Sequence, residues 1–318
     1  MNYILLIVGF LLLIKGADIF VGGASAIAKK LGIPPVIVGL TIVSIGTSAP
    51  ELAVSIISSL QGSNEIAMGN VIGSNLFNTL VVLGVTTIVL PLIIKKDTIK
   101  VDFMINILVT FLLFILTFGK IFNNDNIISR IDGLILVAIC VIYMIFLIIK
   151  SKKTNISEIS EDEKNIRIAK KLVAVILGAV GIVLGGKLVV DSATNIAYSL
   201  GMSEKLVGLT IVAMGTSLPE LVTSVVAATK GENDIALGNV LGSNIFNILL
   251  ILGVSSAITP IPVAQNLIVD FIFLLCVSIF IFALIIFSKG KEKKLTRIEG
   301  VVLVVLYIGY IIYIINRN

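Results

Sequence analysis

Long apolar segments dominate this sequence and limit what the chain can fold into. Ten of them follow one another, at about residues 3–28, 36–60, 66–92, 101–119, 130–150, 171–197, 206–229, 235–258, 267–287 and 298–315. A run of about 18 apolar residues is long enough to cross a bilayer as a helix. The chain is 57% hydrophobic and only 14% charged, which excludes the soluble globular class. The sequence therefore predicts an all-α polytopic membrane protein with ten transmembrane helices.

The two halves of the chain are related in sequence. "VGLTIVSIGTSAPELAVSIIS" from Val38 and "VGLTIVAMGTSLPELVTSVVA" from Val207 are identical at 13 of 21 positions. "IAMGNVIGSNLFNT" from Ile66 and "IALGNVLGSNIFNI" from Ile235 are identical at 10 of 14 positions, with the same offset of 169 residues. A constant offset indicates an internal duplication. We divide the chain into a first five-helix repeat (1–150, motif region 38–79), a linker (151–170) and a second five-helix repeat (171–318, motif region 207–248).

An odd number of helices in each repeat places the second copy in the membrane in the opposite sense. If the N-terminus is outside, 18 of the 24 Lys and Arg residues fall in loops on the other side. The positive-inside rule then predicts two inverted five-helix repeats in the cell membrane, with both termini outside and the central linker in the cytoplasm. The first apolar run has no basic region before it, so it is expected to be a transmembrane helix and not a signal peptide. Inverted repeats with interrupted helices are typical of secondary transporters.

Two acidic residues stand at corresponding places inside apolar segments. Glu51 follows Pro50, and Glu220 follows Pro219. Each proline lacks an N–H and so frees the backbone carbonyl four residues before it. An acidic side chain at the centre of a membrane helix costs about 2.5–3.5 kcal/mol, so such residues are functional by default. We predict that this pair needs a cation or protons to compensate it.

Further polar residues form stripes at helical spacing on the same segments. The stripes are Ser44, Thr47, Ser48 and Ser55 with Glu51; Thr216, Ser217 and Ser224 with Glu220, where Ala213 replaces the first serine; Asn70, Ser74 and Asn78; and Asn239, Ser243 and Asn247. Side-chain oxygens of this kind select Na⁺, Ca²⁺ or Mg²⁺ over zinc or copper, and a flexible site with many oxygens favours Ca²⁺. The alternative interpretation is structural, since membrane hydroxyls often bond back to their own helix and asparagines hold helices together.

The chain lacks histidine, and its two cysteines, Cys140 and Cys276, lie alone in apolar segments. A histidine-based metal site is therefore excluded, and the cysteines are expected to be buried apolar residues.

"GTSAPE" and "GTSLPE", each followed by "GNVIGSN" or "GNVLGSN", resemble the two repeats of the calcium/cation antiporter superfamily, and most closely its prokaryotic sodium/calcium exchangers. The resemblance implies one ion site between the second, third, seventh and eighth helices. In it Glu51 and Glu220 would ligate Ca²⁺ together with the backbone oxygens of Thr47 and Thr216. The resemblance also implies that Na⁺ would use these groups with Ser48, Ser74, Ser217, Ser243 and the carbonyls of Ser44 and Ala213, and that Asn78 and Asn247 would line the centre. Some relatives, including potassium-dependent ones, carry Asp where this chain has Asn247.

We therefore predict Na⁺/Ca²⁺ antiport by alternating access, and no enzymatic activity. The first and sixth helices are the candidates for the moving gate by family analogy, and their charges (Lys15 and Asp18; Lys187 and Asp191) are expected near an interface. A third Na⁺ would make the cycle electrogenic. The expected partners are Na⁺, Ca²⁺ and the lipid bilayer, with no cofactor, nucleic acid or obligate protein partner. The alternatives are Ca²⁺/H⁺ antiport, potassium-dependent exchange, an intramembrane hydrolase with paired acids and a passive cation channel.

Overall fold

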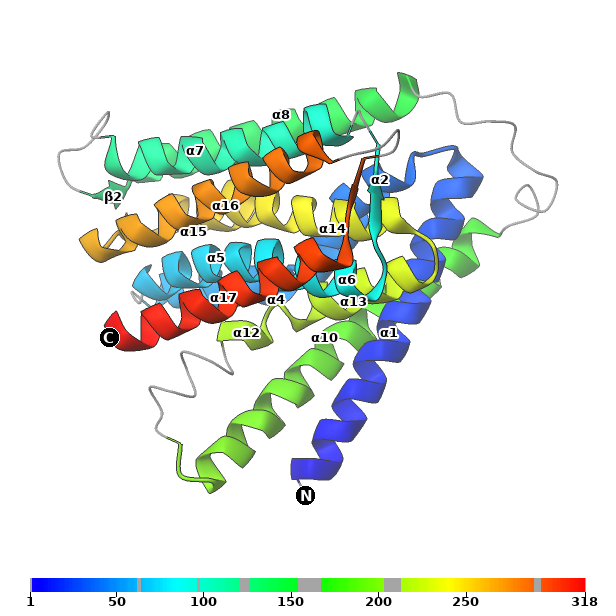
Figure 1. Ribbon diagram of the computed structural model, residues 1–318, viewed down its shortest axis with the longest axis horizontal. Coiled ribbons are helices and arrows are strands. Elements are labelled where there is room, and N and C mark those ends of the chain that lie inside the picture. Colours follow the sequence, from blue (N-terminus) through cyan, green and yellow to red (C-terminus); the bar gives the residue numbers. More distant parts are fainter. Residues whose placement is uncertain are drawn as a thin grey trace.

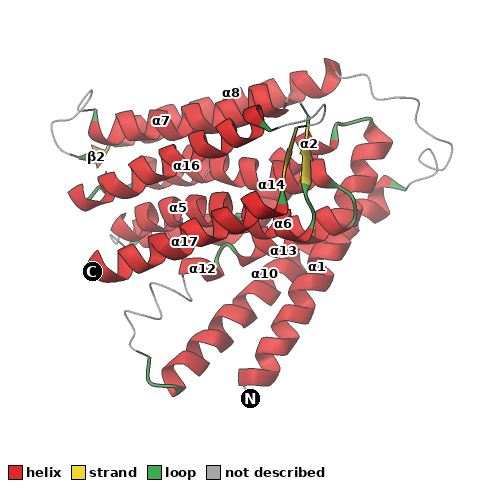
Figure 2. Cartoon of the chain, viewed as in Figure 1, coloured by secondary structure: helices red, strands yellow, loops and turns green. Residues whose placement is uncertain are grey.

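The computed structural model describes residues 2–61, 64–95, 98–119, 126–153, 167–202, 213–288 and 293–317, almost all of them in helices (Figures 1 and 2). In the first half the elements are α1 (Asn2–Leu31), α2 (Pro35–Val38), η1 (Gly39–Val43), α3 (Ser44–Thr47), α4 (Ala49–Leu60), α5 (Asn64–Phe77), η2 (Asn78–Val82), α6 (Leu83–Val89), η3 (Thr98–Phe103), α7 (Met104–Phe118) and α8 (Arg130–Lys153). In the second half they are α10 (Ile168–Ser199), α12 (Ala213–Gly215), α13 (Leu218–Thr229), α14 (Asn233–Phe246), η5 (Asn247–Leu252), α15 (Gly253–Ile258), η6 (Gln265–Leu267), α16 (Ile268–Phe287) and α17 (Arg297–Arg317). The η segments are π-helical except η6, which is a 3₁₀ turn.

The helices agree closely with the apolar segments read from the sequence. Within the described residues, eight helices are long and apolar enough to cross a membrane, and a bent pair, Pro35–Thr47 and Ala49–Leu60, makes a ninth. The predicted segment 206–229 is only partly tested, because residues 203–212 lie outside the described part of the chain. The all-helical membrane class is therefore confirmed, and the count of ten stays a prediction.

The second spanning segment is broken where the sequence places its proline. The pair of helices on either side of the break meets at 49°. Ser48 leaves the helical conformation (φ −83°, ψ 10°), and Ser217 does the same at the corresponding break (φ −93°, ψ 6°). Pro50 and Pro219 occupy the first turn of the next helix, where a missing N–H costs nothing. Each break thus creates a new helix N-terminus inside the protein.

The centre of the bundle is formed by the third spans of the two halves. In the span that runs from α14 to α15, 94% of the most apolar window is buried, compared with 17% in α17. The peripheral helices present their remaining apolar side chains outward, which suits a hydrocarbon environment. The polar stripes lie on the buried central spans and not on the peripheral ones.

The long helices α1 and α10 cross each other closely and lean away from the other helices (Figure 1). Their contact is made through glycines. A Cβ atom on Gly178 would lie 2.6 Å from the backbone nitrogen of Phe20, and one on Gly16 would lie 2.8 Å from that of Ile182. Small residues allow this approach in membranes, where packing drives helix association. The two candidate gate helices therefore form one packed pair.

Two short antiparallel ribbons, absent from the sequence prediction, join the halves. β1 (Leu92–Ile94) pairs with β4 (Lys293–Leu295), and β2 (Ile127–Ile128) pairs with β3 (Ile261–Pro262). In each ribbon, the strand after the third span of one half pairs with the strand before the last helix of the other half. The ribbons lie toward opposite ends of the helices (Figure 2).

The last helix of each half packs on the third span of the other half. A Cβ on Gly300 of α17 would lie 2.6 Å from the carbonyl oxygen of Gly84, and one on Gly133 of α8 would lie 2.7 Å from that of Gly253. Both last helices begin with a capping box, in which a hydroxyl and a carboxylate exchange hydrogen bonds with the backbone. The boxes are Ser129 with Asp132, and Thr296 with Glu299.

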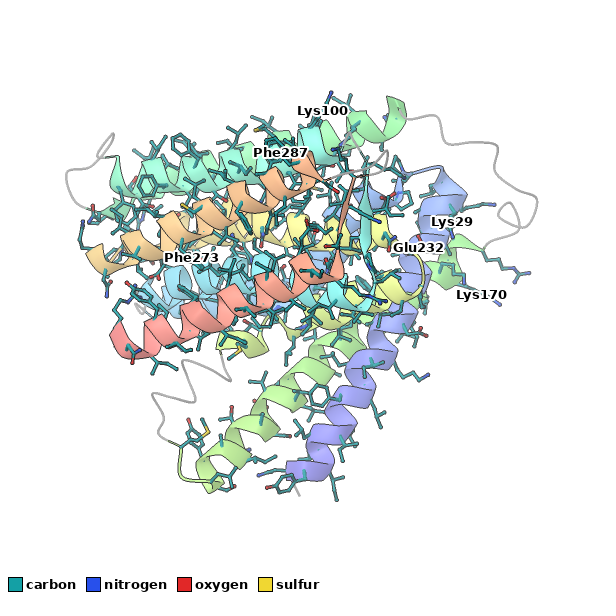
Figure 3. The ribbon with its side chains drawn as sticks, viewed as in Figure 1. Lys29, Lys100, Lys170, Glu232, Phe273 and Phe287 are labelled. Atoms are coloured by element: carbon teal, nitrogen blue, oxygen red, sulfur yellow. The ribbon has the colours of Figure 1, made fainter. Side chains whose placement is uncertain are left out.

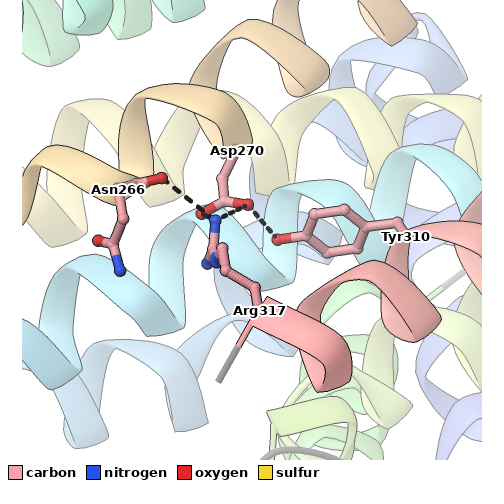
Figure 4. A network of polar contacts seen from close by, with 4 residues as sticks. All are labelled: Asn266, Asp270, Tyr310 and Arg317. Carbon is pink, nitrogen blue, oxygen red and sulfur yellow. Dashed lines mark hydrogen bonds and ion pairs between the residues drawn. The ribbon is translucent and has the colours of Figure 1, made fainter.

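A buried carboxylate ties the fourth and fifth helices together in each half. Lys150 of α8 lies 3.0 Å from Asp102, and Arg317 of α17 lies 3.0 Å from Asp270. Tyr310 also donates to Asp270 at 3.1 Å, and the Arg317 side chain donates to the carbonyl of Asn266 (Figure 4). These pairs fix the peripheral helices near the two ends of the bundle.

Candidate ion-binding site

The two acidic residues lie at the facing breaks and are held by the opposite half of the chain. The Ser48 hydroxyl donates to Glu220 Oε1 at 2.8 Å, and the Ser217 hydroxyl donates to Glu51 Oε1 at 3.0 Å. Both glutamates are completely buried. Each break therefore supplies one carboxylate and one hydroxyl that reaches across to the other carboxylate.

Each carboxylate keeps one oxygen free for a ligand. Glu51 Oε2 and Glu220 Oε2 are buried and have no hydrogen-bond partner among the described residues. Glu51 lies in the first turn of α4, and Glu220 lies in the first turn of α13, so the positive ends of two helix dipoles face the negative charges. Dipoles and hydroxyls alone leave two buried charges under-compensated. A bound cation would supply the missing compensation.

The third spans bring their serines and second asparagines to the same region. Ser243 donates to Glu220 Oε1 at 3.4 Å. The corresponding hydroxyl of Ser74 is buried without a partner in the described ranges, and so are both polar atoms of Asn78 and the Oδ1 atom of Asn247. Asn78 and Asn247 each begin a π-helical segment, η2 and η5. Such segments interrupt regular helix hydrogen bonding and recur at functional sites.

The first asparagines of the two stripes are helix-to-helix ties, as the structural alternative predicted. Asn70 donates to the carbonyl of Glu51 at 3.3 Å and to Ser55 at 3.0 Å. The same geometry recurs where Asn239 donates to the carbonyl of Glu220 at 3.3 Å and to Ser224 at 2.9 Å. These amides anchor each carboxylate-bearing helix to the neighbouring third span.

The remaining predicted site residues are placed less directly. The Thr47 hydroxyl donates to Asn239 Oδ1 at 3.1 Å, and the Ser44 hydroxyl donates back to the carbonyl of Thr41 at 3.2 Å. Both hydroxyls are therefore engaged in packing, which leaves the backbone oxygens as the predicted ligands at these positions. The Thr216 hydroxyl has no partner within the part of the chain described. Ala213 is the first described residue of α12, and its predicted contribution is its carbonyl only.

A cavity of about 400 Å³ opens beside the breaks. It is lined by Pro50 and Val54 of α4, by Gly215, Thr216 and Pro219 around the second break, and by α10 residues that include Gly186, Lys187 and Asp191. Lys187 and Asp191 are exposed at this cavity, and the expectation that they lie near an interface stays a prediction. The lining of this cavity is mostly apolar, and Thr216, Lys187 and Asp191 are its polar members.

Two buried asparagines, Asn75 and Asn244, were not among the predicted site residues. They stand directly after the serines of the two "GSN" motifs, so the four-residue stripe rule places them on another face of each helix. Asn75 donates to the carbonyl of Asn244 at 3.2 Å and accepts a hydrogen bond from Asn247 at 3.0 Å. Their repetition at the 169-residue offset was the signal that could have found them.

The family of sodium/calcium exchanger proteins matches residues 1–149 and 170–316 of the chain. The chain belongs to the sodium/calcium exchanger family. It is thus a multi-pass membrane transporter and not an enzyme, and the ions of this family are cargo.

Individual relatives cover nearly the whole chain. The sodium/calcium exchanger MaX1 of Methanosarcina acetivorans is 35% identical over an alignment of 344 positions, which covers 98% of this chain and 97% of the relative. The inner membrane protein YrbG of Escherichia coli is 35% identical over 299 residues, 91% of this chain and 89% of the relative. Among solved structures, the sodium-calcium exchanger NCX_Mj soaked with zero Na⁺ and Ca²⁺ superposes with a TM-score of 0.84 at 31% identity, over 98% of each chain.

Proposed function

We propose that the protein is an antiporter that exchanges Na⁺ for Ca²⁺ across the cell membrane. The observation that carries this proposal is the pair of fully buried carboxylates, Glu51 and Glu220, each with one oxygen lacking a partner among the described residues. Two negative charges balance one Ca²⁺ or two Na⁺. Ions of both kinds would compete for the same oxygens, and competition for one site couples their opposite movements.

The proposed ligands extend beyond the carboxylates to hydroxyl, amide and backbone oxygens. Ser48, Ser217 and Ser243 already hydrogen-bond the glutamates, and Ser74, Asn78 and Asn247 offer buried polar atoms that lack partners in the described chain. The backbone oxygens of Ser44, Thr47, Ala213 and Thr216 complete the set. Neutral oxygens suit Na⁺, and a third Na⁺ held by them would make the exchange electrogenic, worth about 2.3 kcal/mol per net charge at 100 mV.

The architecture proposed for this function is two inverted repeats of five transmembrane helices, 1–150 and 171–318, joined by the linker 151–170. Reciprocal contacts support it. α17 packs on the first half near Gly84 as α8 packs on the second half near Gly253, and the two ribbons exchange strands in the same sense. Contacts that repeat with the halves exchanged are what a two-fold axis between them produces. An axis in the membrane plane relates inverted repeats.

The orientation proposed is with both termini outside and the linker in the cytoplasm. Lys29 and Lys170, which flank predicted cytoplasmic loops, lie at the same end of the molecule (Figure 3). The C-terminus lies at the other end of the bundle (Figure 1). This distribution agrees with the positive-inside rule.

Alternating access is supported by a difference between the two sides of the site. Between α10 and the first turns of α4 there is the 400 Å³ cavity. At the corresponding place between α1 and α13, Ala17 and Val21 are fully buried, and Lys230 forms an exposed ion pair with Asp18 at 2.8 Å. Movement of the α1 and α10 pair could close the cavity beside α4 and open one beside α13. The site would then face the cytoplasm.

Calcium uptake into proteoliposomes tests the proposal. An outward Na⁺ gradient, at equal pH on both sides and without K⁺, is expected to drive Ca²⁺ inward. Uptake driven only by a proton gradient would support Ca²⁺/H⁺ antiport instead, and uptake that needs K⁺ would support potassium-dependent exchange. Flux that persists without any counter-ion would indicate a channel. Clamping the membrane potential with valinomycin and K⁺ in a second arm is expected to change the rate if the exchange is electrogenic.

A further inference from the structure

A chain of three amides connects the two third spans near the ion site. The side-chain nitrogen of Asn75 donates to the backbone carbonyl of Asn244 at 3.2 Å, and the side-chain nitrogen of Asn247 donates to Asn75 Oδ1 at 3.0 Å. All three residues are at most 2% exposed. The hydrogen bonds between these amides therefore form without competition from water.

Which groups donate and which accept hydrogen bonds fixes the direction of each of these amides. A backbone carbonyl only accepts hydrogen bonds, so it must face the nitrogen end of the Asn75 side chain. The oxygen end of Asn75 then faces Asn247 and requires the nitrogen end of that amide. The Asn247 oxygen is left pointing elsewhere, buried and without a partner in the described chain. The backbone carbonyl of Asn244 thus determines the orientation of the Asn247 amide, which is two hydrogen bonds away from it.

The corresponding amide of the first half is not held in this way. Asn244, the counterpart of Asn75, donates to the Thr79 hydroxyl at 2.8 Å. Both polar atoms of Asn78, the counterpart of Asn247, lack partners among the residues described. The sequence explains the difference, because Ile248 occupies the position that corresponds to Thr79 and offers no hydroxyl. A single substitution between the repeats breaks the symmetry at their centre.

We propose that Asn75 is a positioning residue, which holds the Asn247 amide with its oxygen toward the transported cations. Thr79 acts in the opposite way, since it engages Asn244 and leaves the Asn78 amide free to turn. The two central amides then differ in role. Asn247 is a fixed oxygen donor, and Asn78 adapts to the ion that is bound. A fixed donor favours cation binding because the orientation is set before the ion arrives.

This inference rests on the proposed function and on Asn247 as a ligand, and the test separates the two. An aspartate at position 247 carries oxygen at both ends, so its orientation no longer matters. Asn75→Leu, which keeps the volume and removes the hydrogen bonds, is made in the native chain and in an Asn247→Asp background. The apparent KM for Ca²⁺ and the maximal rate are measured in proteoliposomes under a Na⁺ gradient, with thermal unfolding in detergent as the control for folding.

In the native chain Asn75→Leu is expected to raise the apparent KM for Ca²⁺ about two- to tenfold, the range of one buried hydrogen bond. In the Asn247→Asp background the same substitution is expected to change the KM less than about twofold, because the oriented amide is gone. Equal effects in both backgrounds would mean that Asn75 only supports packing, and the inference would be overturned. Asn247→Leu without effect on the KM for either ion would instead remove Asn247 from the proposed site.

A second pair of variants keeps the test informative if Asn75→Leu fails to fold. Ile248→Thr adds the hydroxyl that the second half lacks, so Asn75 is expected to turn to it and release Asn247, with a rise in KM. Thr79→Ile is the matched control and removes the hydroxyl from the first half. It is expected to leave the Asn247 amide in place, and so to raise the apparent KM for Ca²⁺ less than Ile248→Thr does. An unchanged KM in Ile248→Thr, or the same rise in both variants, would contradict the proposal.

Discussion

The two sides of the ion site carry the same motifs but are packed differently. At the carboxylates the crossing hydrogen bonds are equivalent, since each glutamate accepts one from the opposite break at 2.8 Å or 3.0 Å, although Ser243 also donates to Glu220 at 3.4 Å. The packing around the carboxylates differs between the two halves. On the α1 side Ala17 and Val21 are fully buried, whereas the α10 side borders a cavity of about 400 Å³.

This difference shows how a duplicated sequence can serve a transporter. Similar ligands would give a cation similar chemistry from both halves, while the packing around them leaves a cavity beside α10 and none of the described cavities beside α1. A protein with two such arrangements of similar free energy can present one site to each side in turn. Four sets of variants test how alike the two halves of the protein are.

The largest effect is expected at the carboxylates, where the crossing hydrogen bonds are equivalent. Glu51→Gln and Glu220→Gln each remove one of the two charges that face the cation. Loss of one partner from a buried charged contact commonly costs about 2–5 kcal/mol, so Ca²⁺ uptake should fall about 30-fold or more in both variants. The measurement is Na⁺-driven uptake, with Glu299→Gln in the distant capping box as the control. Normal uptake by either site variant would show that the site is assigned wrongly.

The next largest effect should distinguish the α10 side from the α1 side. Gly186 lines the cavity, and a Cβ there would meet neighbours only at 3.5 Å or more, so Gly186→Cys is tolerated. Ala17 is its counterpart on α1 and is fully buried. In a background without Cys140 and Cys276, a charged thiol reagent added outside is expected to modify Gly186→Cys much faster than Ala17→Cys. Equal rates would contradict the difference in access.

An intermediate effect is expected at the buried ion pairs of the peripheral helices. Asp270→Ala leaves Arg317 and the Tyr310 hydroxyl without their carboxylate (Figure 4). Breaking a buried pair on one side typically costs about 3–5 kcal/mol. Asp102→Ala should cost less, because the flexible chain of Lys150 can carry its ammonium toward water.

Thermal unfolding in detergent measures the two costs. The midpoint is expected to fall further for Asp270→Ala than for Asp102→Ala, and Arg317→Lys should lie between the wild type and Asp270→Ala. A larger loss in Asp102→Ala would show that the two ends of the bundle are not stabilised as the geometry implies.

The smallest effect is expected at the hydroxyls that cross between the halves. Ser48→Ala and Ser217→Ala each remove one hydrogen bond to a glutamate, worth about 0.5–1.5 kcal/mol, or about two- to tenfold in the KM for Ca²⁺. Similar distances predict similar losses in the two variants. A large loss in one and none in the other would show that the halves already differ at the carboxylates.

Much of the fold could be predicted because its causes are local. Hydrophobic length sets the spans, so predicted segments such as 130–150 and 298–315 differ from α8 and α17 by only a few residues. Proline chemistry placed the breaks near Pro50 and Pro219. The cost of a charge in the bilayer identified Glu51 and Glu220, which the structure buries completely at facing breaks.

The sequence by itself determined the membrane class, the duplication, the broken helices and the acidic pair, because each depends on composition and spacing along one segment. Only the tertiary structure decided that Ser48 bonds Glu220 and not Glu51, that Asn75 orients Asn247, and that α1 and α10 pack through glycines. It also decided where the cavity lies. These features depend on which surfaces of distant segments meet, and helical periodicity gives the face of a residue without naming the partner that the face will touch.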